Sequence, residues 1–508
     1  MKKFIIFLLL AIFGLSLNAQ ITFQKTFGGI NAYEANYVQQ TNDEGYIMTG
    51  WTQSGILGSA WDVFLIKTDI NGNELWNKTY GDSDTAYESG TCVEQTTDGG
   101  YVISGEHSNS GFNRGFLIKT KPNGDTLWVK MYENSDSRFV TVRQTLDGGY
   151  IAGGNSKIFK VDSLGNVIWA KKYNGMSSVN ELQQTSDGGF VVTGSNAGDT
   201  SPFLLKINSL GDIIWCKSYP AGYAKSVQQT ADGGYIIAGI NGSSPPYLGY
   251  FIKTDENGDM VWGKNYGSGS GIGYGFFSSS VRQVNGGGYI ALLVNSFDVG
   301  VFYFNTIRID SVGNFIWGKN YQSTYCYGFC IKQTTDEGFV FAGWKGDTLS
   351  SHKHEVYLVK TDQNGVSCNE SSYLLFTSNI TGVATSLIYT AISVNNILNS
   401  FPVYVSSFSL TENILCETII IDNFFPKNEI SIYPNPVENF LNLEFQSDKK
   451  EKIKIEMINL LGQVVLSKNF QTQQSKNNFT LEVSKISKGI YMLRMMGSEI
   501  FIKKIVKE

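Results

Sequence analysis

Short apolar runs separated by turn residues recur along most of the chain. Around Gln229 they read as four strands: "KSVQQT", then "YIIAG" after "ADGG", then "YFIKTD", then "MVWGKNY" after "ENG". The runs have strand length, and Trp262, Lys264 and Tyr266 share a face by the period of two. The 3.6-residue period of an amphipathic helix is absent between them. The pattern therefore predicts an all-β protein.

The sequence motif of the first two strands of this unit occurs seven times in the chain. "QTADGGYIIAG" begins at Gln229, and its counterparts begin at Gln40, Gln95, Gln144, Gln184 and Gln333, with a degenerate copy at Gln283. The last strand carries Trp-x-Lys-x-Tyr in six copies, whose tryptophans are Trp76, Trp128, Trp169, Trp215, Trp262 and Trp317. Their separations are 52, 41, 46, 47 and 55 residues. A period of this length with four short strands is typical of β-propeller blades.

The ends of the repeat array complement each other. The seventh third strand, "EVYLVKTDQNG", is not followed by Trp-x-Lys-x-Tyr. At the other end, "ITFQKTF" (Ile21–Phe27) places Phe23, Lys25 and Phe27 in the Trp, Lys and Tyr positions. We therefore expect a closed seven-bladed β-propeller in which this segment pairs with Val356–Thr361, because closure leaves no free sheet edge inside the ring.

The turn residues and the aromatic strand residues are expected to be structural. Asp232, Gly233 and Gly234 supply the first turn, since Asp bonds to its own backbone and Gly adopts positive φ without steric cost. A lysine between two aromatics, as in Trp262-x-Lys264-x-Tyr266, can lay its stem over them. This motif is interpreted as packing between blades.

The connections between second and third strands vary in length, and variable loops tend to carry function. They are rich in Gly, Ser and Asn and hold scattered aromatics suited to sugar or peptide recognition. The candidate ligand-binding residues are Trp51, Trp61, Phe112, Tyr247, Tyr274 and Trp344. The alternative for each is that it fills the channel or packs on a neighbour.

Residues for catalysis or metal binding do not converge in the sequence. The only histidines are His107, His352 and His354, and no strand-to-helix serine motif occurs. Arg143 and Arg282 directly precede the repeat glutamine, but no arginine triad for a sugar carboxylate emerges. Paired carboxylates for glycoside cleavage are set by the fold and stay open. We expect no catalytic residue, no metal and no cofactor.

The chain begins as an exported protein does. Residues 1–19 hold a charged start, an apolar centre and small residues near Ala19, which predicts a signal peptide. The net charge of −5 gives no basic field for nucleic acid. Residues 431–508 carry 12 Lys and Arg against 8 Asp and Glu, a net charge of +4 that leaves −9 for the rest of the chain.

The six cysteines include no Cys-x-x-Cys pair, which argues against a zinc or redox site. Cys92 and Cys330 occupy the same position in different repeats and are expected to be buried strand residues that lie apart. Cys368 and Cys416 flank a segment with no other cysteine, and in an exported protein the two can form a disulfide.

The last block resembles the type A C-terminal sorting domain of the type IX secretion system. The motifs that carry the resemblance are "YPNPVENFLNLEF" from Tyr433, "INLLGQVV" from Ile458, "ISKGIYMLRM" from Ile486 and "IKKIVK" up to Lys507. The motif residues are Tyr433, Pro434, Asn435, Pro436, Gly462, Gly489, Tyr491, Lys503 and Lys504. The resemblance implies a small β-sandwich, handled by the secretion machinery, that directs its passenger to the medium or to surface lipopolysaccharide.

The predicted domains are a signal peptide at residues 1–19, a propeller at 20–368, a β-prone Ser/Thr/Asn-rich linker at 369–428 and a sorting domain at 429–508. The predicted function is a monomeric, secreted or surface-bound, non-catalytic binding or adhesion module for a glycan, a peptide or another surface protein. The alternative is a secreted propeller hydrolase or lyase that acts on polysaccharide.

Overall fold

The computed structural model describes residues 20–29, 31–54, 60–81, 86–109, 112–133, 138–197, 201–241, 248–267, 275–298, 301–321, 326–346, 354–368, 370–373, 376–380, 385–386, 390–393, 397–400, 404–406, 411–420, 431–447, 450–459, 464–496 and 500–507. The regular elements in these ranges are β-strands, without a helix among them. Accordingly, none of these segments is a helix able to cross a membrane.

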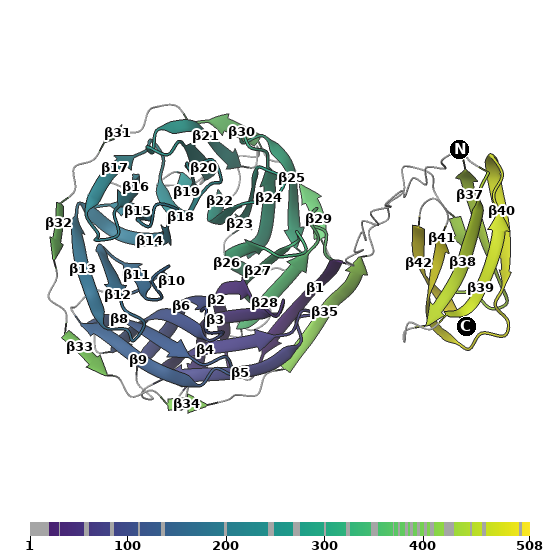
Figure 1. Ribbon diagram of the computed structural model, residues 1–508, viewed down its shortest axis with the longest axis horizontal. Coiled ribbons are helices and arrows are strands. Elements are labelled where there is room, and N and C mark those ends of the chain that lie inside the picture. Colours follow the sequence, from purple (N-terminus) through teal and green to yellow (C-terminus); the bar gives the residue numbers. More distant parts are fainter. Residues whose placement is uncertain are drawn as a thin grey trace, which may run out of the picture. The chain divides into compact units, whose positions relative to one another are not determined.

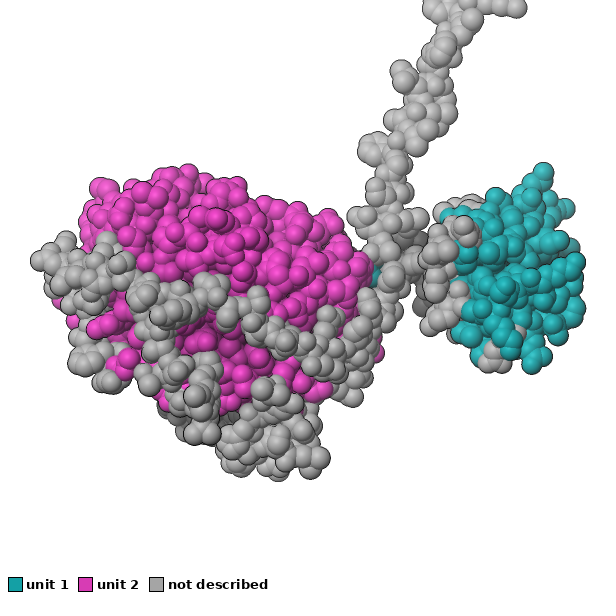
Figure 2. Space-filling model, turned by 90° about the horizontal axis from the view of Figure 1, so that it is seen from below, with its two compact units in different colours: residues 1–20, 420–508 teal, residues 21–419 magenta. Residues whose placement is uncertain are grey.

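The chain divides into two compact units (Figure 2). Residues Ile21–Ile419 form the repeat region, which is magenta and labelled unit 2 in Figure 2. Residues 1–20 and 420–508 form the teal part, labelled unit 1 in the figure; because most of it follows the repeat region in the chain, the text calls it the second unit. The predicted signal peptide at residues 1–19 lies outside the described residues.

The four strands expected around Gln229 are confirmed. They are β18 (Tyr223–Gln229), β19 (Tyr235–Asn241), β20 (Leu248–Thr254) and β21 (Met260–Gly267), and they pair in that order into an antiparallel sheet. The equivalent strands of the other repeats are β2 (Tyr33–Gln40), β3 (Tyr46–Ser54), β4 (Ala60–Thr68) and β5 (Glu74–Gly81); β6 (Tyr87–Gln95), β7 (Tyr101–Asn109), β8 (Phe112–Thr120) and β9 (Thr126–Glu133); β10 (Thr141–Gln144), β11 (Tyr150–Gly154), β12 (Lys157–Val161) and β13 (Val167–Asn174); β14 (Met176–Gln184), β15 (Phe190–Asn196), β16 (Pro202–Ile207) and β17 (Ile213–Ser218); β22 (Gly275–Gln283), β23 (Tyr289–Asp298), β24 (Val301–Ile309) and β25 (Phe315–Tyr321); β26 (Cys326–Gln333), β27 (Phe339–Gly346) and β28 (His354–Thr361). The protein is therefore all-β and built from repeated blade-like sheets.

The sheets lie side by side around a common centre, with β2, β6, β10, β14, β18, β22 and β26 innermost (Figure 1). Each sheet buries its apolar residues against its neighbours. One core cluster, for example, combines Ile236 and Phe251 of one sheet with Leu293 and Ile307 of the next.

The repeat glutamine joins consecutive sheets, which explains its recurrence. The Oε1 atom of Gln95 accepts a hydrogen bond from the backbone N–H of Asn42 in the preceding repeat, at 2.8 Å. Five further glutamines accept equivalent bonds. The seventh bond links the last repeat to the first, because Thr335 N–H donates to Gln40 Oε1 at 2.8 Å.

The Trp-x-Lys-x-Tyr strand packs on the second turn of the next repeat. Gly124 has φ +81°, and a Cβ there would lie 2.8 Å from the Trp76 ring, so only glycine lets the indole approach. The Tyr80 hydroxyl donates to the Gly124 carbonyl at 2.7 Å, and Lys78 forms an ion pair with Asp125 at 2.8 Å. The predicted packing role of this motif is confirmed.

The predicted pairing of the N-terminal segment is also confirmed. Strand β1 (Gln20–Gly28) runs antiparallel to β28, with Phe23 opposite Lys360 and Phe27 opposite Val356. Phe23 contacts Gly72 as Trp76 contacts Gly124, and Lys25 donates to Asn73 Oδ1 at 2.6 Å. The segment thus takes the place of the missing last strand.

The segment at residues 369–428, expected to be a β-prone linker, contains seven short strands among its described residues. It contains β29 (Glu370–Tyr373), β30 (Phe376–Asn379), β31 (Thr385–Ser386), β32 (Thr390–Ser393), β33 (Ile397–Ser400), β34 (Tyr404–Ser406) and β35 (Thr411–Ile420). We call these strands the belt. In chain order they pair with β25, β21, β17, β13, β9, β5 and β1, the outermost strand of each sheet (Figure 1).

The second unit is a two-layer sandwich. One sheet orders β36 (Ser431–Tyr433), β37 (Phe440–Ser447) and β40 (Ser475–Glu482). The other orders β39 (Val464–Gln471), β38 (Lys452–Asn459), β41 (Gly489–Met496) and β42 (Ile500–Lys507). Their inner faces share one core, to which Leu443, Ile455 and Leu493 contribute fully buried side chains.

Candidate functional site

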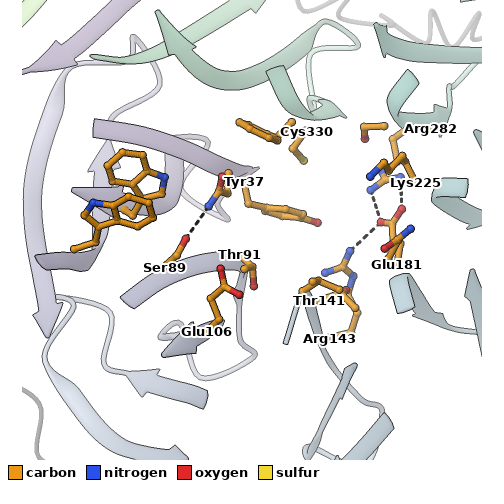
Figure 3. A pocket seen from close by; sticks show the side chains of 17 residues that line it. Tyr37, Ser89, Thr91, Glu106, Thr141, Arg143, Glu181, Lys225, Arg282 and Cys330 are labelled. Carbon is orange, nitrogen blue, oxygen red and sulfur yellow. Dashed lines mark hydrogen bonds and ion pairs between the residues drawn. The ribbon is translucent and has the colours of Figure 1, made fainter. Parts of the chain in front are cut away.

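A cavity of about 380 Å³ lies at the centre of the repeat region (Figure 3). Every innermost strand contributes to its lining, which is Asn36, Tyr37, Ser89, Thr91, Val140, Thr141, Arg143, Asn180, Glu181, Lys225, Ser280, Arg282, Phe329 and Cys330. Trp51, Trp61 and Glu106 complete it from second and third strands. Trp51 lies towards the end of β3 and Trp61 near the start of β4, so the cavity lies towards the side where these strands connect.

The residue directly before the repeat glutamine determines whether a repeat places a cation at the centre. Where it is Gln or Glu, its side chain bonds to the next sheet: Gln39 Oε1 accepts from Gln95 N–H at 2.8 Å, and Gln228 Oε1 accepts from Gln283 N–H at 2.7 Å. In three repeats the position is Arg143, Arg282 or Lys332. These side chains have no acceptor atom and cannot make that bond.

Two of these cations converge on one buried carboxylate, Glu181 on β14. Arg282 Nη2 lies 2.6 Å from Glu181 Oε1, and Arg143 Nη2 lies 3.1 Å from the same oxygen. The second oxygen, Oε2, accepts from the Ser226 hydroxyl at 2.7 Å and from the Val227 N–H at 3.0 Å. Both carboxylate oxygens are therefore occupied by protein groups.

These partners keep Glu181 ionised. Burial raises the pKa of its carboxyl, but the attraction of Arg282, Arg143 and Lys332 outweighs burial and holds the pKa at about 2. The carboxylate cannot donate a proton at neutral pH, because it carries none.

Tyr37 lies between the cations, at the position three before the repeat glutamine. The Arg143 guanidinium carbon is 5.5 Å from the centre of its ring, and Lys332 Nζ is 4.9 Å from it. Both distances are within the range of cation–π attraction. Burial, followed by repulsion from Arg282, lowers the pKa of Lys332 to about 8, and burial raises the pKa of Tyr37 well above its usual value.

The two repeat-position cysteines also face this cluster. Cys92 Sγ lies 2.9 Å from Arg143 Nη1, and Cys330 lines the cavity. Both are buried strand residues, as expected, and both are free thiols. Although they belong to different repeats, both lie beside the same charged cluster, because the innermost strands meet there.

Aromatic side chains form another part of the wall. The Trp51 and Trp61 rings are stacked with centroids 4.3 Å apart, and Tyr87 meets Trp61 edge-on at 5.1 Å. In the same lining, the Asn36 amide donates to the labelled Ser89 Oγ at 3.2 Å (Figure 3). It also donates to the Gly90 carbonyl at 2.8 Å. The cavity thus combines a flat apolar surface with hydroxyl, amide and charged groups.

The second unit contains a different constellation, around its "YPNP" motif. The Tyr433–Pro434 and Asn435–Pro436 peptide bonds are cis. Asn435 Oδ1 accepts from the Val506 N–H at 2.8 Å, and the Tyr433 hydroxyl donates to Glu444 at 3.3 Å. The motif at the start of this unit is thereby bonded to its last strand.

Residues 431–508 match the family described as the secretion system C-terminal sorting domain. The second unit is a type IX secretion sorting domain. The sorting domain indicates export through the type IX machinery to the cell surface or the extracellular space, as the sequence predicts.

The comparisons do not identify the repeat region. No curated protein matches the chain. Among solved structures, a protein of unknown function from Bacteroides caccae is 13% identical over 54% of this chain and 94% of its own, with a TM-score of 0.35. Sqt1 from Chaetomium thermophilum is 10% identical over 66% of this chain and 98% of its own, with a TM-score of 0.38. These scores carry no argument about function.

The structure brings together two of the six candidate ligand-binding residues, Trp51 and Trp61. Trp344 is stacked on His354 at 4.2 Å and is not in the cavity lining; His354 Nδ1 in turn lies 2.5 Å from Glu34 Oε1. Phe112 lies in β8, but its side chain is outside the described residues, as are Tyr247, Tyr274 and His352.

The remaining predicted site residues are those of the sorting motif and the two cysteines of the predicted disulfide. Tyr491 is buried and donates to the Ser487 carbonyl, and Gly489 begins β41. Gly462 and the side chains of Lys503 and Lys504 lie outside the described residues. Cys368 is disulfide-bonded, and its pairing with Cys416, whose side chain is not described, stays a prediction.

Sequence reasoning missed the charged cluster around Glu181. Its signal was present as departures from the repeat: Arg143, Arg282 and Lys332 replace Gln or Glu, and Glu181 stands where other repeats have Cys, Thr, Ser or Tyr. These residues lie on different innermost strands and come together where those strands meet, although dozens of residues separate them in the sequence.

Proposed function

We propose that the protein is an exported, non-catalytic binding protein whose repeat region is a closed seven-bladed β-propeller with its ligand site in the central cavity. Three contacts support the closure: the β1–β28 pairing, the Thr335–Gln40 hydrogen bond and the Phe23–Gly72 contact. The sorting domain supports delivery to the surface or the medium.

The observation that carries the binding proposal is the composition of the cavity. A stacked tryptophan pair and convergent polar side chains line one cavity of about 380 Å³. Small-molecule sites are typically concave, have about 300–1,000 Å³, and combine apolar or aromatic walls with a few placed polar groups. A part of a glycan or a peptide side chain suits this space.

Glycoside hydrolysis is the second candidate, and the cavity supports it less. It requires one carboxyl group that donates a proton and a second that acts as nucleophile or base. Glu181 is held ionised and both of its oxygens accept hydrogen bonds from protein groups. Among the described lining residues the other carboxylate is Glu106, which lies 3.9 Å from Arg138.

A glycan and peptide array probed with the full exported protein tests the binding proposal. We expect the double variant Trp51→Ala/Trp61→Ala to lose at least about tenfold in affinity, or about 1.4 kcal/mol, for each ligand the wild type retains. Trp344→Ala is the matched control, because it removes an indole outside the cavity lining. Equal binding by the double variant and the wild type, with both shown to be folded by thermal unfolding, would contradict the proposal.

A further inference from the structure

We propose that the central cavity selects a short acidic sugar chain, with a carboxylate held by Lys225 and by the positive field of the Arg143–Arg282 cluster and with a ring of the chain stacked on the tryptophan pair. The inference rests on the proposed function and names the chemistry of the ligand. It follows from a charge count, from one unpaired cation and from the position of the aromatic wall.

The first observation is an excess of positive charge at the centre. Arg143, Lys225 and Arg282 line the cavity with Glu106 and Glu181. Within the lining, three cations therefore face two carboxylates.

This excess contrasts with the rest of the chain. Outside residues 431–508 the sequence carries a net charge of −9, so the cations of the cavity are opposite in sign to the net charge of the chain around them. Field lines concentrate in a cleft with low-dielectric walls, and a local positive centre there attracts an anionic group more strongly than the same charges on an open surface.

The second observation is that Lys225 is available. Its side chain is exposed towards the cavity, and among the described residues no carboxylate forms an ion pair with it. Arg143 and Arg282, by contrast, are committed to Glu181. Lys225 is therefore the cation that can bond directly to an incoming carboxylate, while the arginines supply long-range attraction.

The third observation distinguishes a sugar from other anions. The flat face of a sugar ring packs on an indole, whereas a phosphate or sulfate ion gains nothing from Trp51 and Trp61. Ser89, Thr91 and Asn180 lie in the same lining; the Thr91 hydroxyl and the Asn180 amide donate to backbone carbonyls, and the oxygen of each side chain can still accept a hydrogen bond from a sugar hydroxyl. The cavity volume limits the bound portion to a short stretch of sugar units.

Titration calorimetry with the full exported protein tests the proposal. The probes are uronate disaccharides (galacturonate, glucuronate and mannuronate) and the methyl ester of each, which keeps the ring and removes the charge. We expect the wild type to bind at least one acid about tenfold more tightly than its ester, with the preference weakened by salt. Lys225→Gln should remove most of that preference. Lys172→Gln, an exposed lysine on β13, is the control and should behave as the wild type.

The outcomes separate the two proposals. If acid and ester bind equally, or if Lys225→Gln keeps the preference, selection of a carboxylate is wrong; loss of that binding in Trp51→Ala/Trp61→Ala would still support a ligand site in the cavity. If the tryptophan variant binds the acid as tightly as the wild type, the sugar does not stack on Trp51 and Trp61 and the site assignment is wrong. If neither form binds, the carboxylated-sugar proposal is wrong, and the array decides the binding function separately.

Discussion

In six repeats the aspartate of the first turn pairs with a lysine of the third strand at 2.8–3.0 Å, as Asp232 does with Lys253. The lysine also donates to a backbone carbonyl, so that its buried ammonium group is fully bonded. The degenerate repeat changes both partners. Gly286 stands in place of the aspartate and Arg308 in place of the lysine, and the guanidinium bonds instead to the carbonyls of Ile309 and Gly287. The two changes compensate because the guanidinium group finds backbone carbonyls as its acceptors and does not need the aspartate that bonds to the lysine in the other repeats.

At the same scale, Glu181 is predicted to stabilise the fold in a pH-dependent way. Its pKa of about 2 lies below the value of 4.5 for an unperturbed side chain. A carboxyl group with a lowered pKa in the folded state stabilises above its unfolded pKa, and the contribution disappears as the pH falls from 4.5 towards 2. We expect Glu181→Gln to lower the free energy of unfolding at pH 7 by about 3–5 kcal/mol, because it leaves two buried arginines without a counter-charge.

Urea unfolding at pH 7 and at steps down to pH 2 measures this effect. The difference between Glu181→Gln and the wild type should shrink as the pH falls. Glu256→Gln, on an exposed turn, is the control and should stay within about 0.5 kcal/mol of the wild type at pH 7. A Glu181→Gln protein as stable as the wild type at pH 7 would show that the arginines find other partners.

At the scale of elements, β1 is the strand on which the proposed closure of the ring depends. It comes from the start of the chain, yet it pairs with β28 more than 300 residues later, and Phe23 is fully buried. Its lysine and first aromatic reproduce the contacts of the Trp-x-Lys-x-Tyr strands, although Phe27 lacks the hydroxyl with which Tyr80 bonds to Gly124. A local sequence motif thus fixes a contact between distant parts of the chain.

We expect Phe23→Ala to lower the free energy of unfolding by about 3–5 kcal/mol, since it empties a buried aromatic site. Hydrogen exchange should also become faster in Val356–Lys360, whose backbone pairs with β1. Ile168→Ala, at an exposed position of β13, is the control and should change neither quantity. Unchanged exchange in β28 after a destabilising Phe23→Ala would mean that β1 is held by other contacts.

At the scale of the whole molecule, the belt covers the outer edges of the sheets and also connects the repeat region to the sorting domain in the chain. Each blade-like sheet ends in an outer strand, and an unpaired outer strand is a template for association with another chain. The belt pairs with these strands one after another, in the reverse of their chain order, before the chain enters the sorting domain. The exported passenger therefore carries its own cover for these edges.

Two truncations test this division of roles. A chain that ends at residue 430 lacks the sorting domain, and we expect it to fold but to stay in the periplasm. A chain that ends at residue 368 also lacks the belt, and we expect it to aggregate, because outer strand edges become accessible. Fractionation followed by size-exclusion chromatography measures both results. Normal secretion of the first protein would contradict the role of the sorting domain, and a monodisperse second protein would contradict the covering role of the belt.

The sequence by itself determined the strands, the turns, the packing motif, the pairing of β1 and the sorting domain. These features are local or periodic, and repetition makes each of them visible several times. Only the tertiary structure decided the belt and the charged centre. The belt strands have no repeat motif, since they bond through backbone groups that any sequence provides. Glu181, Arg143 and Arg282 lie on three different strands, and their contact depends on the meeting of the innermost strands at one centre, where single departures from the repeat become neighbours.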